Sequence, residues 1–169
     1  MSDGIRWLAA ESDRPRLVLF LGSNIGNFDR PHAGEFLHRL ADALRPGDHV
    51  LAGFDLKKEI EVIRLAYNDG EGAARRFNLN LLERLNRDLG ADFDRARFSH
   101  YAMYEPVKGA IEFYLVSRVA QRVRVEALRR SFDFGAWEAL RVGASQKFLP
   151  GEVDAMAGGG VRGGGGVLR

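Results

Sequence analysis

The stretch LVLFLGSNIGN, from Leu17 to Asn27, decides the fold. Its first five residues form a short, continuously apolar run without helical spacing, which is typical of a strand buried on both faces. The rest, Gly22 to Asn27, consists mainly of small and amide residues and predicts a loop. A buried strand that ends in such a loop is the usual start of a strand–loop–helix unit.

The residues that follow complete this unit. Pro31 fits the first turn of a helix, and apolar residues at 3–4 spacing from Phe36 to Leu44 extend that helix. A second apolar stretch, Val50 to Phe54, predicts another strand, which ends at Asp55. We therefore expect an α/β fold with a parallel sheet, in which ligands bind at the carboxyl ends of the strands.

Further helices and strands are expected downstream. The sequence predicts helices over 59–67 and 72–89, with Gly90 capping the second helix. The apolar face predicted for this second helix is Ala74, Phe77, Leu81, Leu85 and Leu89. Strand-like stretches follow at 98–104, 110–117, 121–127 and 140–148, and a turn at 106–109 joins the first two.

The end of the chain differs in composition. Residues 149–169 hold 8 of the 20 glycines, so we expect a Gly-rich flexible tail after a domain that covers residues 1–148. A glycine loop that cradles phosphate would need a preceding strand and a following helix, and the sequence predicts neither there.

Composition excludes several classes of protein. With 169 residues, 46% of them hydrophobic, the chain can bury a core, and the absence of cysteine rules out disulfides, thiol nucleophiles and CxxC zinc sites. The net charge of +2 comes from scattered residues and not from a basic stripe, so we expect no nucleic-acid partner. No apolar run reaches the roughly 18 residues of a membrane span, and the N-terminus lacks a signal-peptide pattern. We expect a cytoplasmic protein without membrane attachment.

Common catalytic motifs are missing from the body of the chain. It contains no GxxxxGK[ST], GxGxxG or GxSxG pattern, and its four histidines show no metal-ligand spacing, so we expect no metal site. The most informative polar residue is Asn27, at the predicted carboxyl end of the first strand. Its amide can both donate and accept hydrogen bonds, which suits an amine or a carboxylate ligand. The residues alone leave open whether Asn24 and Asn27 bind a ligand or merely cap the next helix.

Longer strings resemble the histidine-specific, S-adenosylmethionine-dependent methyltransferase family. These strings are LVLFLGSNIGNF (Leu17 to Phe28), LRPGDHVLAGFDLKK (Leu44 to Lys58), AYNDGEGAARRFNLNLLERLNRDLGADFD (Ala66 to Asp94), IEFYLVSRVAQRVRV (Ile111 to Val125) and SQKF (Ser145 to Phe148). The resemblance covers about residues 3–148. It implies a partial Rossmann-like class I methyltransferase sheet with a β-rich substrate-binding insertion. It also implies S-adenosyl-L-methionine as cofactor and methylation of the α-amine of L-histidine in ergothioneine biosynthesis.

The resemblance implies substrate-binding roles for four residues. Asn27 matches the asparagine that holds the amino and carboxylate groups of the substrate, and Tyr67 matches a tyrosine that binds the carboxylate. Ser145 matches a serine that contacts the imidazole ring, and Phe113 stands where relatives carry an apolar residue near the substrate. Without the family, Tyr67 and Phe113 read as ordinary aromatic core residues.

The resemblance implies cofactor contacts at Gly22 and Ser23, where the chain of relatives passes the cofactor and the reacting methyl group. It implies no catalytic side chain and no metal. Two departures from the family pattern matter. Gly143 stands where the family has a glutamate that hydrogen-bonds the imidazole, so the sequence leaves open which side chain the substrate carries. The N-terminal, cofactor-binding half of the family pattern is also absent from this sequence.

We therefore expect the chain alone to be weakly active or inactive. We also expect it to self-associate through an exposed sheet edge. Two alternatives remain at this point. One is a non-catalytic fragment or pseudo-enzyme that pairs with another chain, and the other is an α/β binding module without methyltransferase activity.

Overall fold

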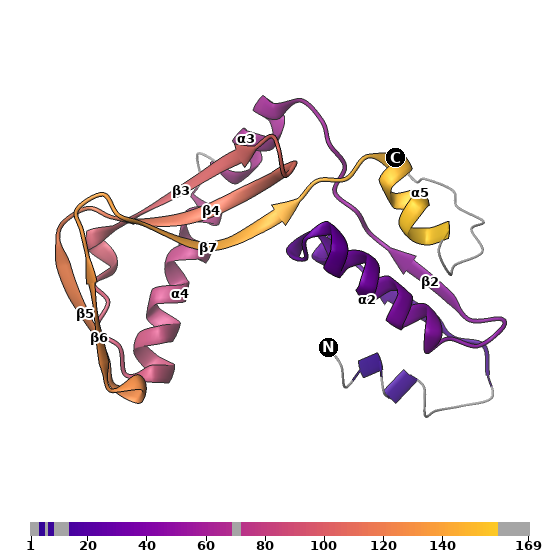
Figure 1. The fold of residues 1–169 in the computed structure, drawn as a ribbon, viewed down its shortest axis with the longest axis horizontal. Helices are drawn as coiled ribbons and strands as arrows, with labels where there is room; N and C mark the ends of the chain where they lie inside the picture. Colours follow the sequence, from indigo (N-terminus) through magenta and orange to yellow (C-terminus); the bar gives the residue numbers. More distant parts are fainter. Residues whose placement is uncertain (1–3, 6, 9–13, 69–71, 159–169) are drawn as a thin grey trace. The chain divides into compact units, whose positions relative to one another are not determined.

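A computed structural model describes residues 4–5, 7–8, 14–68 and 72–158 of the chain. They divide into two compact units, and the sequence had predicted a single domain over 1–148. The first unit combines residues 1–57 with residues 145–169, and the second unit is the continuous segment 58–144. The architecture is mixed α/β, as expected (Figure 1).

The first unit contains the predicted strand–loop–helix–strand sequence. Strand β1 (Leu17–Phe20) leads through a 3-10 turn, η1 (Asn24–Asn27), into helix α2 (Arg30–Asp42) and then strand β2 (His49–Ala52). The two strands are parallel, with Leu17 opposite His49 and Phe20 opposite Ala52. Asp29 caps α2 by accepting a hydrogen bond from the backbone N–H of His32. Pro31 lies in the first turn of the helix, as predicted.

The prediction that the first strand is buried on both faces is wrong for the described residues. Val18 and Phe20 pack against the core that α2 covers, whereas Leu17 and Leu19 on the other face are 62% and 56% exposed. Alternate residues of a strand point to opposite faces, so a single covering layer leaves every second residue open. In the described part of this unit, one face of the parallel strand pair is thus apolar and is not covered by another layer.

The C-terminal part of the first unit runs beside the segment after β2. Leu56 and Phe148 form a parallel bridge, in which the N–H of Phe148 donates to Asp55 O (3.0 Å) and the N–H of Lys57 donates to Phe148 O (2.9 Å). Helix α5 (Pro150–Gly158) follows and packs Val153 and Met156 against the core. Residues 150–158 are therefore helical, although the sequence predicted a flexible tail from 149. The remainder of that tail, 159–169, lies outside the described residues.

In its described residues, the second unit contains two α-helices, two short 3-10 helices and two β-sheets. The α-helices are α3 (Ile60–Tyr67) and α4 (Ala73–Leu89). A three-stranded sheet has the order β3 (Phe98–Glu105), β4 (Ala110–Ser117) and β7 (Ala139–Gln146). The last two residues of β7 belong to the first unit. An antiparallel hairpin, β5 (Gln121–Val125) and β6 (Arg130–Phe134), completes this unit, and its second strand was not predicted.

The apolar face predicted for α4 is correct only in part, with Ala74, Leu81, Leu85 and Leu89 partly buried. Leu79 and Leu82 are buried against Phe98 and Leu115 of the sheet, whereas Phe77 is 80% exposed. Gly90, with φ 60°, ends the helix in the left-handed conformation that the sequence predicted for its cap. Among the helices that the structure describes, none has the length and apolar character needed to span a bilayer.

Candidate functional site

The turn after β1 has an unusual backbone. Gly22 (φ 76°) and Ser23 (φ 54°) are both left-handed, and non-glycine residues seldom adopt that conformation. The side chain of Asn24 supports the turn by donating from Nδ2 to Leu21 O at 2.9 Å. Strained positions of this kind cluster at binding sites, where surrounding contacts hold them in place. The turn exposes backbone at the carboxyl end of a parallel strand, which is where α/β proteins bind ligands.

Gly26 brings this turn against the end of β7. A Cβ atom at Gly26 would lie 3.0 Å from Gln146 O and 3.4 Å from Ser145 Oγ. The glycine therefore lets the two segments approach this closely without a steric conflict. The next residue, Asn27, is exposed. Two of the predicted substrate-binding residues, Asn27 and Ser145, thus belong to segments in direct contact within the first unit.

A buried charged group lies beside Ser145. The side chain of Lys147 is fully buried, and its Nζ donates to Ser145 Oγ at 2.7 Å. The same Nζ lies 3.0 Å from Asp55 Oδ2, which places the carboxyl ends of the β2 segment and of β7 together. Buried lysines are rare unless they are paired, so this contact is a specific feature of the fold.

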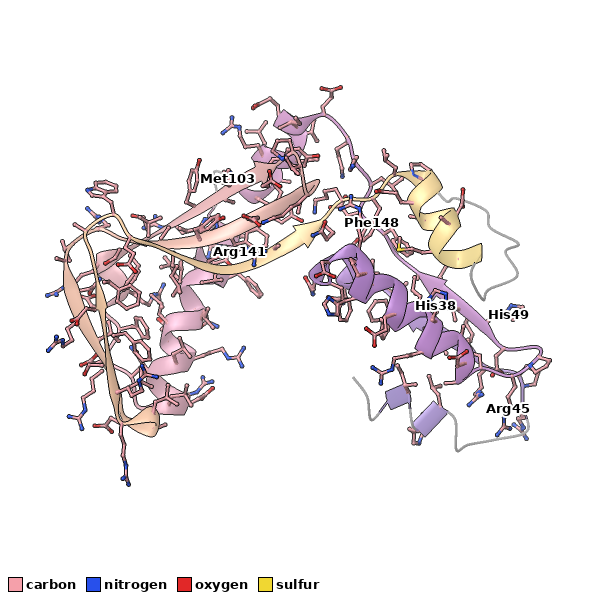
Figure 2. All side chains as sticks on the ribbon, in the orientation of Figure 1. His38, Arg45, His49, Met103, Arg141 and Phe148 are labelled. Atoms are coloured by element: carbon pink, nitrogen blue, oxygen red, sulfur yellow. The ribbon has the colours of Figure 1, made fainter. Side chains whose placement is uncertain are left out.

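Arg30 connects three segments of the first unit around this lysine. Its guanidinium donates to Gln146 Oε1 (3.0 Å) and to Lys147 O (3.2 Å). Its Nε donates to Glu152 Oε1 at 2.8 Å, and this hydrogen bond lowers the pKa of the Glu152 carboxyl. The guanidinium carbon also lies 5.9 Å from the ring centre of Phe148, which is fully buried and labelled in Figure 2. These contacts hold the end of β7 against α2 and α5.

Tyr67 and Phe113 form an aromatic pair in the second unit. Their ring centres are 5.4 Å apart, and both rings pack against a cluster of buried residues, Ile63, Ala102 and Ile111. A Cβ atom at Gly143 would lie 3.5 Å from Cδ2 of Phe113, an ordinary contact distance. A larger side chain at position 143 would therefore start beside the Phe113 ring.

A buried carboxylate in the same unit is not among the predicted residues. Glu112 on β4 accepts hydrogen bonds from Lys108 Nζ (2.8 Å), from Arg141 Nε (3.2 Å) and from the Tyr114 hydroxyl. Arg141 is labelled in Figure 2. The hydrogen bonds from Lys108 and Tyr114 lower the pKa of Glu112, and the same carboxylate raises the pKa of Tyr114. In the parts of the chain that the structure describes, no group of three or more acidic or histidine side chains could hold a metal ion.

The six predicted site residues fall into two sets. Gly22, Ser23, Asn27 and Ser145 belong to the first unit, and Tyr67 and Phe113 belong to the second. Within each unit the structure brings members of a set together, through Gly26 in the first and through ring contact in the second. Sequence reasoning placed Asp55 at the carboxyl end of the second strand but missed its pairing with Lys147. The available signal was a lysine inside the predicted strand 140–148, since a charge that is buried in a strand must find a partner.

Comparison with known proteins places these residues in context. The model of a family described as histidine-specific methyltransferase, SAM-dependent, matches residues 2–160. The chain is 46% identical over 140 residues to the histidine N-alpha-methyltransferase of Mycolicibacterium smegmatis, an alignment that covers 83% of this chain and 44% of that protein. It is 30% identical over 163 residues to an L-tryptophan methyltransferase of Psilocybe serbica, covering 91% of this chain and 45% of that protein.

The same region is found in a larger fungal protein. The chain is 33% identical over 102 residues to ergothioneine biosynthesis protein 1 of Schizosaccharomyces pombe, covering 60% of this chain and 13% of that protein. The chain thus spans less than half the length of the curated relatives that it matches.

Proposed function

Because the chain belongs to the histidine-specific, S-adenosylmethionine-dependent methyltransferase family, we propose that it serves in methyl transfer to the α-amine of an amino acid. L-Histidine is the first substrate to test, since the chain shares 46% of its aligned residues with a histidine N-alpha-methyltransferase. The observation that carries the proposal is the family match over residues 2–160, which includes all six predicted site residues.

We propose that Asn27 and Tyr67 hold the amino and carboxylate groups of the substrate. The exposed amide of Asn27 can accept a hydrogen bond from an amine and donate one to a carboxylate. Ser145 would contact the side chain of the substrate, and Phe113 would provide an apolar wall. The close packing of Gly26 on Ser145 and of Tyr67 on Phe113 supports these assignments within each unit.

We propose that Gly22 and Ser23 lie against S-adenosylmethionine, which supplies a methyl group on a positively charged sulfur when it is bound. The backbone fits this role because two left-handed residues expose their peptide groups, and Gly22 has no side chain to cover them. This chemistry needs no metal ion, since transfer of a methyl group from sulfur to nitrogen is a single in-line displacement.

The contribution of the chain to such a reaction is orientation. The amine must be neutral and must lie about 3 Å from the methyl carbon, on the side opposite to sulfur. Asn27 and Tyr67 would fix the amino acid so that its nitrogen faces that carbon. The amine must lose a proton before it reacts, and we propose that water accepts this proton.

A methylation assay tests the proposal. The 169-residue chain would be assayed alone, and its matched segment would also replace the corresponding segment of the Mycolicibacterium smegmatis relative. Both proteins would be incubated with S-adenosylmethionine and a panel of amino acids, and products would be identified by mass spectrometry. We expect methylated histidine or another single amino acid product from the chimaera. A folded chimaera that methylates none of them would contradict the proposal.

We also propose that the chain self-associates through the uncovered face and edge of the β1–β2 pair. Leu17, Leu19 and Leu51 are about half exposed or more on this parallel pair. Parallel sheets are normally covered on both faces, and open strand edges favour pairing with another chain. Light scattering over a range of concentrations tests this proposal, and a monomer at all concentrations would contradict it.

A further inference from the structure

The fully buried Lys147 is placed where it can control the hydrogen-bonding role of Ser145. Its Nζ is 2.7 Å from Ser145 Oγ and 3.0 Å from Asp55 Oδ2. Its backbone is fixed as well, because Arg30 donates to Lys147 O at 3.2 Å. A buried ammonium is costly unless it is paired, so these partners determine where the Nζ lies.

The chemistry of the groups fixes the direction of the hydrogen bond between Lys147 and Ser145. An ammonium has three donors and no acceptor, so Ser145 Oγ must be the acceptor in this pair. The hydroxyl of Ser145 has a single hydrogen, which must then point away from Nζ toward a different acceptor. Gly26 lies close to the same serine, since a Cβ atom added at Gly26 would be 3.4 Å from Ser145 Oγ, and the absence of a side chain there leaves room beside the hydroxyl.

We propose that Lys147 is a positioning residue that makes Ser145 a hydrogen-bond donor toward the side chain of the amino-acid substrate. This inference rests on the proposed function, in which Ser145 contacts that side chain. A neutral imidazole has one nitrogen that accepts a hydrogen bond, whereas the indole N–H only donates. Lys147 therefore favours substrates whose side chain carries an acceptor, such as histidine, over tryptophan.

A double-mutant cycle in the chimaera that carries the matched segment of this chain tests whether Lys147 acts through Ser145. The variants are Lys147→Met, which keeps the side-chain length but removes the charge, Ser145→Ala, and both together. Calorimetric titration would give the Kd for L-histidine and for L-tryptophan in the presence of S-adenosylmethionine. Lys57→Met is the matched control, because its side chain is partly exposed and has no place in the proposed site.

We expect each single variant to weaken histidine binding about tenfold, the size of one charge-assisted hydrogen-bond contribution. The double variant should bind histidine no more weakly than Ser145→Ala alone, since residues that act as one unit are not additive. Tryptophan binding should change less than about twofold in all variants, because its indole has no acceptor for Ser145. Lys57→Met should leave both affinities unchanged.

A second measurement keeps the test decisive if Lys147→Met does not fold. In protein labelled with ¹⁵N-lysine, Ser145→Ala should shift the ammonium signal of Lys147 and leave that of Lys57 in place. An unmoved Lys147 signal would overturn the inference. The inference would also be overturned if the protein without substitutions binds histidine but the losses in the cycle are additive. Equal losses of affinity for histidine and for tryptophan would overturn it as well. The proposed function would survive either result. Absence of saturable amino-acid binding by the folded chimaera would overturn the proposed function and this inference with it.

Discussion

Replacing Gly26 with alanine tests the contact on which the first unit's proposed site depends. The new methyl group would lie 3.0 Å from Gln146 O and 3.4 Å from Gln146 N, both of them backbone atoms that cannot rotate away. Overpacking of this kind costs about 1–3 kcal/mol, whereas the lower entropy of the unfolded alanine chain returns about 0.4–1 kcal/mol. We expect a net loss of about 1–2 kcal/mol in the free energy of unfolding.

Gly34→Ala is the matched control in the same unit. Gly34 lies inside helix α2, and a Cβ atom there would meet nothing within 4 Å. Only the favourable terms remain, so this variant should be more stable than wild type by about 0.5–1 kcal/mol. Urea unfolding followed by circular dichroism would measure both changes. If the two variants shift the unfolding free energy in the same direction, the close packing of Gly26 on β7 is refuted.

Three further predictions concern the site, the buried carboxylate and the exposed strand face. Asn27→Ala should weaken histidine binding about tenfold in calorimetry. Asn24→Ala should have a smaller effect because its amide already bonds Leu21 O, so equal effects would contradict the assignment. The pKa of Glu112 is lowered from 4.5, so its stabilising contribution is present above that pH and is lost as the pH falls through the lower, folded value. Glu112→Gln should therefore reduce the loss of unfolding free energy between pH 7 and pH 3, and an unchanged pH profile would count against the ion pairs described. Leu19→Glu should abolish concentration-dependent association in light scattering, because it places a charge on the uncovered face of β1; persistent association would show that another surface is responsible.

Local patterns were enough to predict the strand–helix–strand order of the first unit. A short apolar run, a proline at a helix start and a Pro-Gly stop act within a few residues, so β1, α2 and β2 were identified with small errors at their ends. The turn at 106–109 and the two strands on either side of it were also predicted, since antiparallel neighbours leave their signal in one continuous stretch.

Features that depend on distant contacts were not predicted. The spacing in α4 fits more than one helical face, and contact with Phe98 and Leu115 selects the face that includes Leu79 and Leu82. Strand β6 has four exposed residues out of five and therefore lacks an alternating apolar signal. The pairing of Lys147 with Asp55 joins residues 92 positions apart, which no local pattern can reveal.

For the candidate site too, local sequence patterns predicted some features, and contacts between distant residues determined others. Asn27 stood out because it follows a buried-type strand, but its roles and those of Tyr67, Phe113 and Ser145 came from resemblance to a family. The structure adds the packing of Gly26 on Ser145, which involves a residue without a side chain. Glycine positions of this kind carry no chemical signal in the sequence, so only coordinates identify them.

The first unit is built from two separate segments of the chain, and this constrains the order in which the chain can fold. Residues 58–144 form a continuous segment, so the second unit can acquire its contacts as soon as that segment leaves the ribosome. The bridge between Leu56 and Phe148 cannot form until the ribosome has passed residue 148. Until then β1, α2 and β2 lack Phe148 and α5, and closing so long a loop carries an entropic cost. Folding of the N-terminal strands is thus completed late in synthesis, after that of a segment that follows them.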